Sequence, residues 1–337
     1  MKTQPIRAGR TGAALASRAG QRKTLPTLTC PSCHRKIVSV AFSSNAKGGA
    51  PHASTYASCL RRCEDCGRGF SNAATSHVAR LTELYRDPFL NLPASIADGH
   101  AAALAQALNV LNRPSKRAKF VSANSEDHVT WTLFRHLQAE GRLRTFLSCM
   151  GIDFATPQSA EPILLLWGVP IPPSAPGRQV RSDLIGVLND LKERHERRSE
   201  PDVILDCGSR GIVFIEVKLR SPNESKADYE GWQKYLKDTD AFSESAQAKR
   251  SGLYELARNW RIAWDMAKHR PMALVNLGPP NLFTGKYAAP LKGFTRSLQL
   301  TPKRQFRTVG WESLWGALPN HPEWLRRYAE ARRVPIS

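Results

Sequence analysis

The sequence predicts an α/β fold, with a small mixed β-sheet flanked by helices and a cysteine-rich module ahead of it. Short apolar runs typical of buried strands lie within 161–169, 199–220 and 272–277. Amphipathic helical segments at 180–197 and 253–268 alternate with these runs, and two Cys-x-x-C pairs lie near the N-terminus. We therefore expect an α/β domain and at least one smaller unit, which a chain of 337 residues can accommodate.

The beginning of the chain is predicted to be disordered. Residues 1–28 contain basic, small and hydroxyl side chains but no acid, which is a composition typical of disorder. An organelle transit peptide has a similar composition and is an alternative, whereas nothing here resembles a secretory signal. We favour a basic disordered tail over residues 1–24 and a cytoplasmic protein.

The two Cys-x-x-C pairs predict a zinc site. Cys30 and Cys33 form one pair, and Cys63 and Cys66, followed by Gly67, form the other. Each pair makes a tight turn whose thiolates can bind one side of a tetrahedral zinc ion, and glycine permits the left-handed backbone that such a turn tends to need. The 29 residues between the pairs exceed the usual spacing, so we expect a loop or extra strands there. The metal would supply the folding energy of so small a unit.

Other interpretations of the cysteines stay open. Cys59 lies four residues before Cys63 and could replace one ligand, and His34 and His52 are further candidates. A redox-active Cys-x-x-C motif or a pair of disulfides would give the same pattern, but disulfides need an oxidising compartment. We favour a structural zinc on the two Cys-x-x-C pairs.

Two amphipathic helices are predicted between Ser71 and Asn112, where they would bridge the zinc module and the α/β domain. The next predicted helix covers 124–138. Ser125 is a suitable N-cap, and acids in the first turn suit the helix dipole. Helical spacing places four apolar side chains of this helix toward the core: Val129, Leu133, Phe134 and Leu137.

A β-hairpin is predicted between Ser199 and Arg220, where two apolar runs flank the turn Gly-Ser-Arg-Gly. If the turn is centred on Ser209, Asp202 lies directly opposite Glu216. Side chains alternate between the two faces of a strand, so Asp202, Glu216 and Lys218 would then project to one side. Opposed Cβ atoms are about 5 Å apart, and two carboxylates at that distance need a cation between them. Asp206 shares this face but lies nearer the turn.

This hairpin resembles the motif of the PD-(D/E)XK, or restriction-endonuclease-like, nuclease superfamily. Pro201-Asp202 matches the first half of the motif, and Glu216-Val217-Lys218 matches the second. The resemblance implies a Mg²⁺- or Mn²⁺-dependent DNA endonuclease that leaves a 5′-phosphate. Asp202, Glu216 and the Val217 carbonyl would hold the metal, and Lys218 would stabilise the attacking hydroxide and the transition state.

The same resemblance suggests two more site residues. Members of the superfamily often supply a further acid from a helix before the sheet, which implies Glu126, with Asp127 as the alternative. Some carry Gln and Tyr on the helix that follows the lysine strand. Here Gln233 matches that glutamine, but position 237 is Lys rather than Tyr, so the match is partial.

Composition favours a nucleic-acid partner. The formal net charge is +20 and the isoelectric point is about 10.1, which gives the chain a strong field for polyanions such as DNA. No apolar run is long enough to cross a membrane. A homodimer is one arrangement that the sequence permits. The alternative functions are a DNA- or partner-binding zinc-ribbon protein whose nuclease-like domain does not cut, and an RNA-directed protein.

These observations predict five segments. The C-terminal segment contains Trp311, Trp315 and Trp324 on predicted helices, and we expect these side chains in the core. The segments are a basic disordered tail, a zinc-ribbon-like module, a helical linker, a nuclease core and a C-terminal helical extension, at 1–24, 25–75, 76–120, 121–285 and 286–337.

Overall fold

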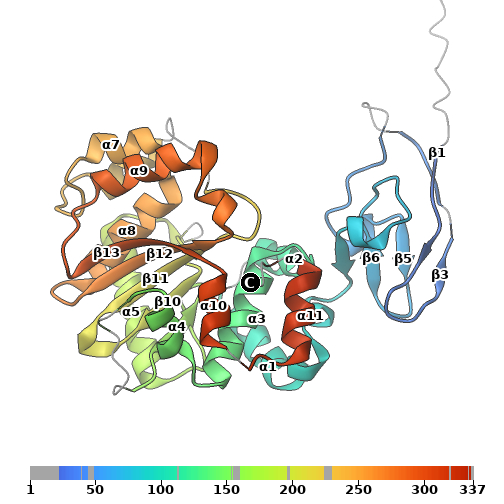
Figure 1. Ribbon diagram of the computed structural model, residues 1–337, viewed down its shortest axis with the longest axis horizontal. Coiled ribbons are helices and arrows are strands. Elements are labelled where there is room, and N and C mark those ends of the chain that lie inside the picture. The colour runs from blue at the N-terminus through green and yellow to red at the C-terminus, as the bar shows by residue number, and fades with distance from the viewer. Residues whose placement is uncertain are drawn as a thin grey trace, which may run out of the picture.

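The chain forms an α/β body and a small β-rich module. Figure 1 shows the module at one end of the long axis, with helices α1, α2 and α11 between it and the sheet of the body. The predicted N-terminal tail lies almost entirely outside the described residues. The computed structural model describes residues 23–38, 40–44, 49–111, 114–152, 154, 160–195, 198–223, 230–318, 320–332 and 334.

A six-stranded mixed sheet forms the centre of the body, which confirms the predicted α/β class. Its strand order is β13-β12-β11-β10-β8-β9. The pairs β9–β8, β8–β10 and β10–β11 are antiparallel, whereas β11–β12 and β12–β13 are parallel. The bounds are Ile163–Leu166 (β8), Val169–Pro170 (β9), Val203–Asp206 (β10), Ile212–Val217 (β11), Met272–Gly278 (β12) and Arg304–Gly310 (β13).

Two hydrophobic clusters cover the two faces of this sheet. Alternate side chains of each strand enter opposite clusters, as Val213 and Ile215 do on one face and Ile212 and Phe214 on the other. Both faces of the inner strands are therefore buried, which explains the nearly continuous apolar runs of β8, β10, β11 and β12. The helices on the Val213 face are α1 (Ala94–Leu111), α3 (Glu126–Ala139), α4 (Leu143–Cys149), α10 (Glu312–Ala317) and α11 (Glu323–Arg332). The helices on the Phe214 face are α5 (Ala175–Asp190), α6 (Gln233–Leu236), α7 (Ser245–Ser251), α8 (Tyr254–Ala267) and α9 (Ala288–Ser297).

The hairpin of β10 and β11 has the predicted register. Val203 pairs with Ile215, and Asp206 pairs with Ile212. The Cys207 N–H donates to the Gly211 carbonyl at 2.9 Å, so the turn is centred on Ser209. Continuing this register by one residue brings Asp202 opposite Glu216, as the sequence predicted.

Helix α3 begins as predicted. The Ser125 hydroxyl accepts a hydrogen bond from the His128 N–H and so caps the helix. The four apolar side chains that helical spacing directed inward are fully buried: Val129, Leu133, Phe134 and Leu137.

His128 on the same helix gives the protein a predicted sensitivity to acid. Its imidazole is buried, and Nδ1 lies 2.6 Å from the Tyr328 hydroxyl. Burial, reinforced by Arg332, lowers the pKa of His128 well below its ordinary value. Below about pH 6.5 the unfolded chain therefore binds a proton at His128, whereas the folded chain does not. The free energy of unfolding falls as the pH is lowered through this range.

We expect the free energy of unfolding to fall by roughly 1 kcal/mol per pH unit in this range from His128 alone. Urea denaturation of the wild type and His128→Phe at a series of pH values measures the effect. The variant should have a shallower pH dependence. If the free energy of unfolding had the same pH dependence in the wild type and in His128→Phe, His128 would not be the source of the acid sensitivity.

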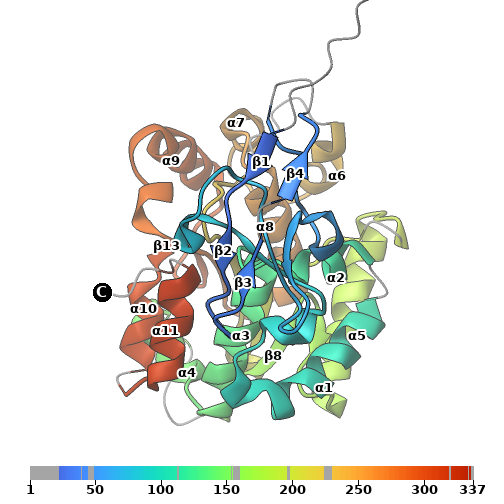
Figure 2. The same ribbon diagram turned by 90° about the vertical axis from the view of Figure 1, so that its right-hand side faces the viewer.

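The N-terminal module contains three small antiparallel sheets. Figure 2, seen from the module's side, shows its strands in front of the body. The buried Arg61 guanidinium donates to four backbone carbonyls and so connects the loops of the module: Pro26, Ser71, Ala73 and Thr75. The sheets are β1 (Lys23–Leu25) with β4 (Val40–Phe42), β2 (Leu28–Thr29) with β3 (Lys36–Ile37), and β5 (Arg61–Cys63), β6 (Arg68–Phe70) and β7 (Glu83–Tyr85).

Strand β7 lies in the range that the sequence assigned to a helical linker. It pairs with β6, and it also connects the module to the body. The Tyr85 N–H donates to the Val121 carbonyl at 2.8 Å, and the Ala123 N–H donates to the Glu83 carbonyl at 2.9 Å. The remainder of the range contains α1 and α2 (Pro114–Phe120). Of these, only α1 lies between Ser71 and Asn112, where the sequence predicted two helices, because β7 and short turns occupy the first half of that stretch.

The C-terminal segment is likewise more than a helical extension. Strand β13 completes the central sheet, although it lies after residue 285, where the sequence ended the nuclease core. The tryptophans of this segment behave as predicted, because Trp311 and Trp315 are buried and Trp324 packs against the core as a partly buried side chain.

Candidate functional site

The acids and the lysine of the hairpin meet at the carboxyl end of β11. Lys218 Nζ lies 2.7 Å from Glu216 Oε1 and 2.9 Å from Glu255 Oε2. Glu216 and Lys218 are only 4 % and 7 % exposed. Burial by itself lowers the pKa of Lys218, but Glu216 and the other nearby carboxylates outweigh it and hold this pKa well above its ordinary value. The ammonium group therefore stays charged.

Asp202 belongs to the same cluster. Its Oδ2 accepts a hydrogen bond from the Val217 N–H at 2.9 Å. Burial, reinforced by the nearby Glu216, raises the pKa of Asp202 well above its ordinary value. Asp206, the other acid on this face of the hairpin, is not part of the cluster. Both of its oxygens accept hydrogen bonds from Arg270 Nη1 at 3.1 Å, near the turn of the hairpin.

Glu126 reaches this cluster from the first turn of α3. Its Oε1 accepts a hydrogen bond from the Leu219 N–H at 2.9 Å. Burial raises the pKa of Glu126, although Lys218 acts in the opposite direction. Asp127 instead accepts from Lys116 Nζ at 2.7 Å. The structure thus places Glu126 beside the end of β11 and Asp127 farther along the same pocket.

Helix α8 supplies two polar residues that the sequence reasoning missed. Glu255 pairs with Lys218, and Asn259 Nδ2 donates to Glu216 Oε2 at 2.7 Å. They lie four residues apart and therefore on one face of the helix. The signal in the sequence was the presence of polar residues among the buried positions of an amphipathic helix. Asn259 is 1 % exposed, so its amide needs the partner that Glu216 provides.

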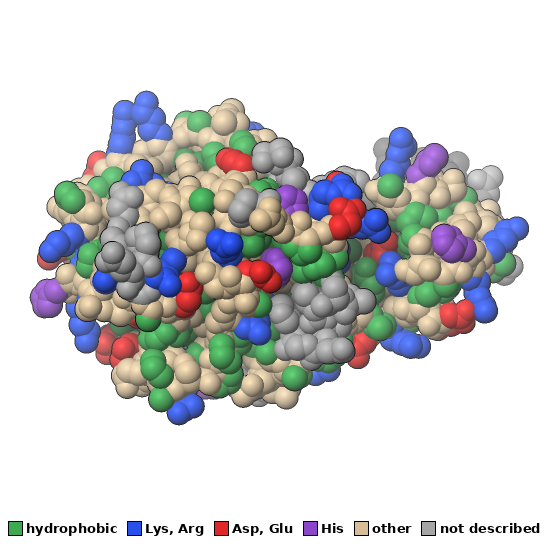
Figure 3. Space-filling model, turned by 60° about the horizontal axis from the view of Figure 1, so that its bottom comes forward, with side chains coloured by type: hydrophobic (Ala, Val, Ile, Leu, Met, Phe, Trp, Pro, Cys, Tyr) green, Lys and Arg blue, Asp and Glu red, His purple; other side chains and the backbone are tan. Residues whose placement is uncertain are grey.

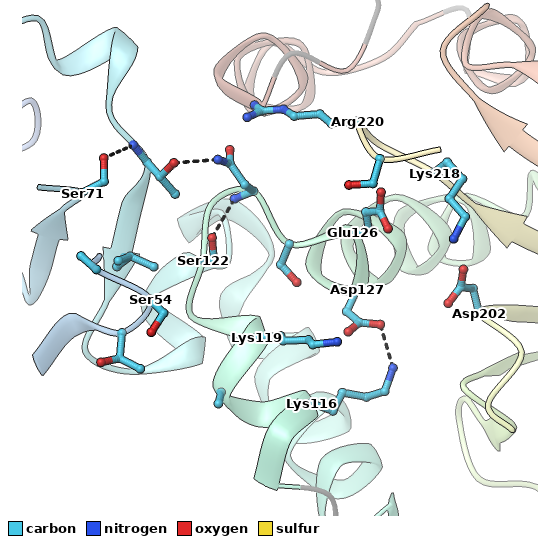
Figure 4. Close-up of a pocket in the computed structure, with 18 of the residues that line it drawn as sticks. Ser54, Ser71, Lys116, Lys119, Ser122, Glu126, Asp127, Asp202, Lys218 and Arg220 are labelled. Atoms are coloured by element: carbon cyan, nitrogen blue, oxygen red, sulfur yellow. Dashed lines mark hydrogen bonds and ion pairs between the residues drawn. The ribbon is translucent and has the colours of Figure 1, made fainter. Parts of the chain in front are cut away.

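A pocket of about 800 Å³ contains this cluster and extends to the N-terminal module. One wall holds Asp202, Glu216 and Lys218, and the opposite wall comes from module residues 52–55 with Ser71 and Thr82. In Figure 4 the module serines face the acids across the pocket, and Lys116 and Lys119 extend into it from α2. The lining thus combines hydroxyl groups with both cationic and acidic side chains.

Gln233 is not brought to this pocket. It is exposed on α6 and lines a separate hollow with Leu236 and Lys249. The inward positions of this short helical segment are taken by Trp232 and Tyr235, each 1 % exposed. Burial of these two rings turns Gln233 away from the acids.

The four predicted cysteines form a second cluster, in the module. The Sγ atoms of Cys30, Cys33, Cys63 and Cys66 all lie within 4.8 Å of one another. Four thiolates at such separations fit a tetrahedral ion with metal–sulfur distances of about 2.3 Å, as zinc requires. This donor set can hold a structural zinc.

The backbone of both Cys-x-x-C turns suits this site. Gly67 has the predicted left-handed conformation, with φ of +60°, and His34 has the equivalent conformation after the first pair, with φ of +57°. Cys59 lies outside the cluster, packed with Ala53 and Leu84. Burial raises the pKa of Cys59 to about 11, so this thiol stays protonated.

Positive charge is spread over the molecule. Figure 3 shows Lys and Arg side chains scattered across both the body and the module on the face in view. The net charge of +20 gives the molecule a positive field, which attracts polyanions in general. Across the described residues, no helix is both long and apolar enough to cross a bilayer.

Comparisons with models of protein families, with curated proteins and with solved structures gave no match.

Proposed function

We propose that the protein is a divalent-cation-dependent nuclease that hydrolyses phosphodiester bonds in DNA. The observation that carries this proposal is the convergence of Asp202, Glu216, Lys218 and Glu126 at one end of the sheet, inside a polar pocket. The hairpin of β10 and β11 lies between helices α5 and α8 and is followed by β12, so the motif lies inside an α/β core. Both the motif and its setting support membership of the PD-(D/E)XK superfamily.

The acidic cluster suits Mg²⁺ or Mn²⁺. Its donors are carboxylate oxygens, which hard divalent cations prefer, and Asp202 and Glu216 would be ligands, with the Val217 carbonyl as a third. Four carboxylates act on the ammonium of Lys218, namely Glu216, Glu255, Asp202 and Glu126. Arg258 offsets part of the charge of Glu216 and Glu255, and a bound divalent cation would offset the rest. When bound, the cation would polarise the scissile phosphate and lower the pKa of a water.

The protein's own groups would position and stabilise the reaction. Lys218 is held between Glu216 and Glu255 and stays protonated, so it can stabilise negative charge that develops on the phosphate and the attacking oxygen. Asn259 fixes one oxygen of Glu216. The Leu219 N–H fixes one oxygen of Glu126, which would complete the metal shell or position a second ion.

The polar lining of the pocket suits a nucleic-acid backbone. Hydroxyl, Lys and Arg side chains are the usual contacts of phosphate and sugar groups, and the pocket offers Ser54, Thr55, Lys119 and Arg220. The zinc-binding module supplies one wall of this pocket, so its proposed role is to shape the substrate path as well as to fold around zinc.

A cleavage assay tests the proposal. The full-length protein is incubated with linear, nicked, single-stranded and branched DNA, and with RNA, in Mg²⁺ or Mn²⁺. We expect cleavage of DNA with 5′-phosphate products and none in EDTA. Binding of DNA without any cleavage under these conditions would instead favour a binding protein with a non-cleaving nuclease-like domain.

A further inference from the structure

A second pocket adjoins the candidate active site. Its volume is about 310 Å³, and it shares Ser221 with the larger pocket. Ser221 lies three residues after Lys218 and is therefore at most about 10 Å from it. A strand bound at the acids could reach the second pocket within a few nucleotides.

The chemistry of this second pocket differs from that of the first. Its walls are mainly apolar and carry one half-buried aromatic ring, Tyr287, above which the Lys286 ammonium lies 5.1 Å from the ring centre. The other apolar walls are Pro222, Leu253, Leu282, Pro290 and Leu291. A flat aromatic ligand would cover this surface, whereas a phosphate would find little to bind.

One polar group of the pocket lacks a partner. Asn223 is 9 % exposed, and its Oδ1 has no hydrogen-bond partner among the described residues. A buried acceptor left unpaired costs free energy, so an N–H donor from a ligand would be favoured there. Nucleobases combine a flat apolar face with N–H donors at the edge, as this pocket requires.

We infer that this apolar pocket binds an unpaired nucleobase of the strand whose phosphate lies at Lys218. Tyr287 provides the stacking surface, and Asn223 accepts a hydrogen bond from the edge of the base. This inference rests on the proposed action on nucleic acid and refines it. The substrate is single-stranded or locally unpaired, because a base inside a duplex would first have to leave the stack, which costs a few kcal/mol.

Binding measurements test the base pocket separately from cleavage. Fluorescence anisotropy compares a short single strand, the corresponding duplex, and single strands with one abasic position moved along the chain, all without added divalent cation. The proteins are the full-length wild type, Tyr287→Ala, the matched control Tyr287→Phe, and Asn223→Leu. Circular dichroism confirms that each variant is folded.

Stacking on a protein ring contributes about 1–3 kcal/mol per base, so Tyr287→Ala should weaken single-strand binding by about 5- to 150-fold. Tyr287→Phe should bind like the wild type, and Asn223→Leu should also bind more weakly. At one abasic position the loss caused by Tyr287→Ala should vanish, because the base it would contact is absent. Equal losses on intact and all abasic strands, or no loss, would overturn the base pocket.

The two proposals fail in different ways. If the protein cleaves DNA but Tyr287→Ala changes neither binding nor cleavage, the nuclease proposal stands and the base-pocket proposal is wrong. If binding depends on Tyr287 and on one base but no substrate is cleaved, the base-pocket proposal stands and the nuclease proposal is wrong.

Discussion

Replacing Lys218 with alanine should abolish phosphodiester cleavage while leaving DNA binding largely intact. The ammonium group is held by Glu216 and Glu255 at the centre of the acidic cluster, where it would stabilise charge that develops in the transition state. Removal of one such group typically lowers the rate by about 10²–10³. Single-turnover cleavage in Mg²⁺ measures the effect, and gel-shift titration measures binding. Asp202→Ala should give the same result, because it removes a ligand of the proposed metal.

The hairpin provides a matched control for these variants. Asp206 is the last residue of β10 and Asp202 directly precedes that strand, four residues earlier, but Asp206 binds Arg270 instead of the cluster. Asp206→Asn should therefore retain cleavage, measured well below its melting temperature. Wild-type rates in Lys218→Ala or Asp202→Ala would remove this site from consideration.

Loss of zinc should unfold the N-terminal module. Structural zinc sites contribute on the order of 10 kcal/mol of apparent binding free energy, and the short strands of this module bury few apolar side chains. We expect one zinc ion per chain by elemental analysis. Cys63→Ser should lose the metal, and limited proteolysis should then digest the module while the α/β body resists.

Cys59 supplies the control for the zinc prediction. It lies in the same module, buried at 2 % exposure, but outside the four-cysteine cluster. Cys59→Ala should keep a full complement of zinc, with at most a small loss of stability. Loss of zinc in Cys59→Ala, or a wild-type protein that carries none, would contradict the assignment. Because module residues line the pocket opposite Asp202, Cys63→Ser should also weaken DNA binding.

The local features of the fold were predictable from sequence. The register of the hairpin follows from a short turn between two apolar runs, so counting outward from Ser209 was enough to oppose Asp202 and Glu216. The start of α3 follows from the cap at Ser125 and the 3.6-residue period. The cysteine cluster follows from two rigid Cys-x-x-C turns that each need a partner.

The segment boundaries were less predictable, because strand pairing joins residues that are far apart in sequence. The sequence of β7 has no pattern that distinguishes it from a linker. It is a strand because β6 pairs with it on one side and residues 121–123 form hydrogen bonds with it on the other. Strand β13 has a polar composition, and only its parallel pairing with β12 identifies it as part of the sheet. Neither pairing leaves a local pattern that would have placed these ranges in the module or the core.

The sequence by itself determined the chemistry of the two clusters: opposed carboxylates with a lysine on one hairpin, and four thiols on two turns. Tertiary structure decided what surrounds them. Packing of α8 on the sheet brought Glu255 and Asn259 to Lys218 and Glu216, and burial of Trp232 turned Gln233 away. Docking of the module placed its loops across from the acids. Spacing along the chain fixes contacts within one element, whereas contacts between elements depend on how their apolar faces pack.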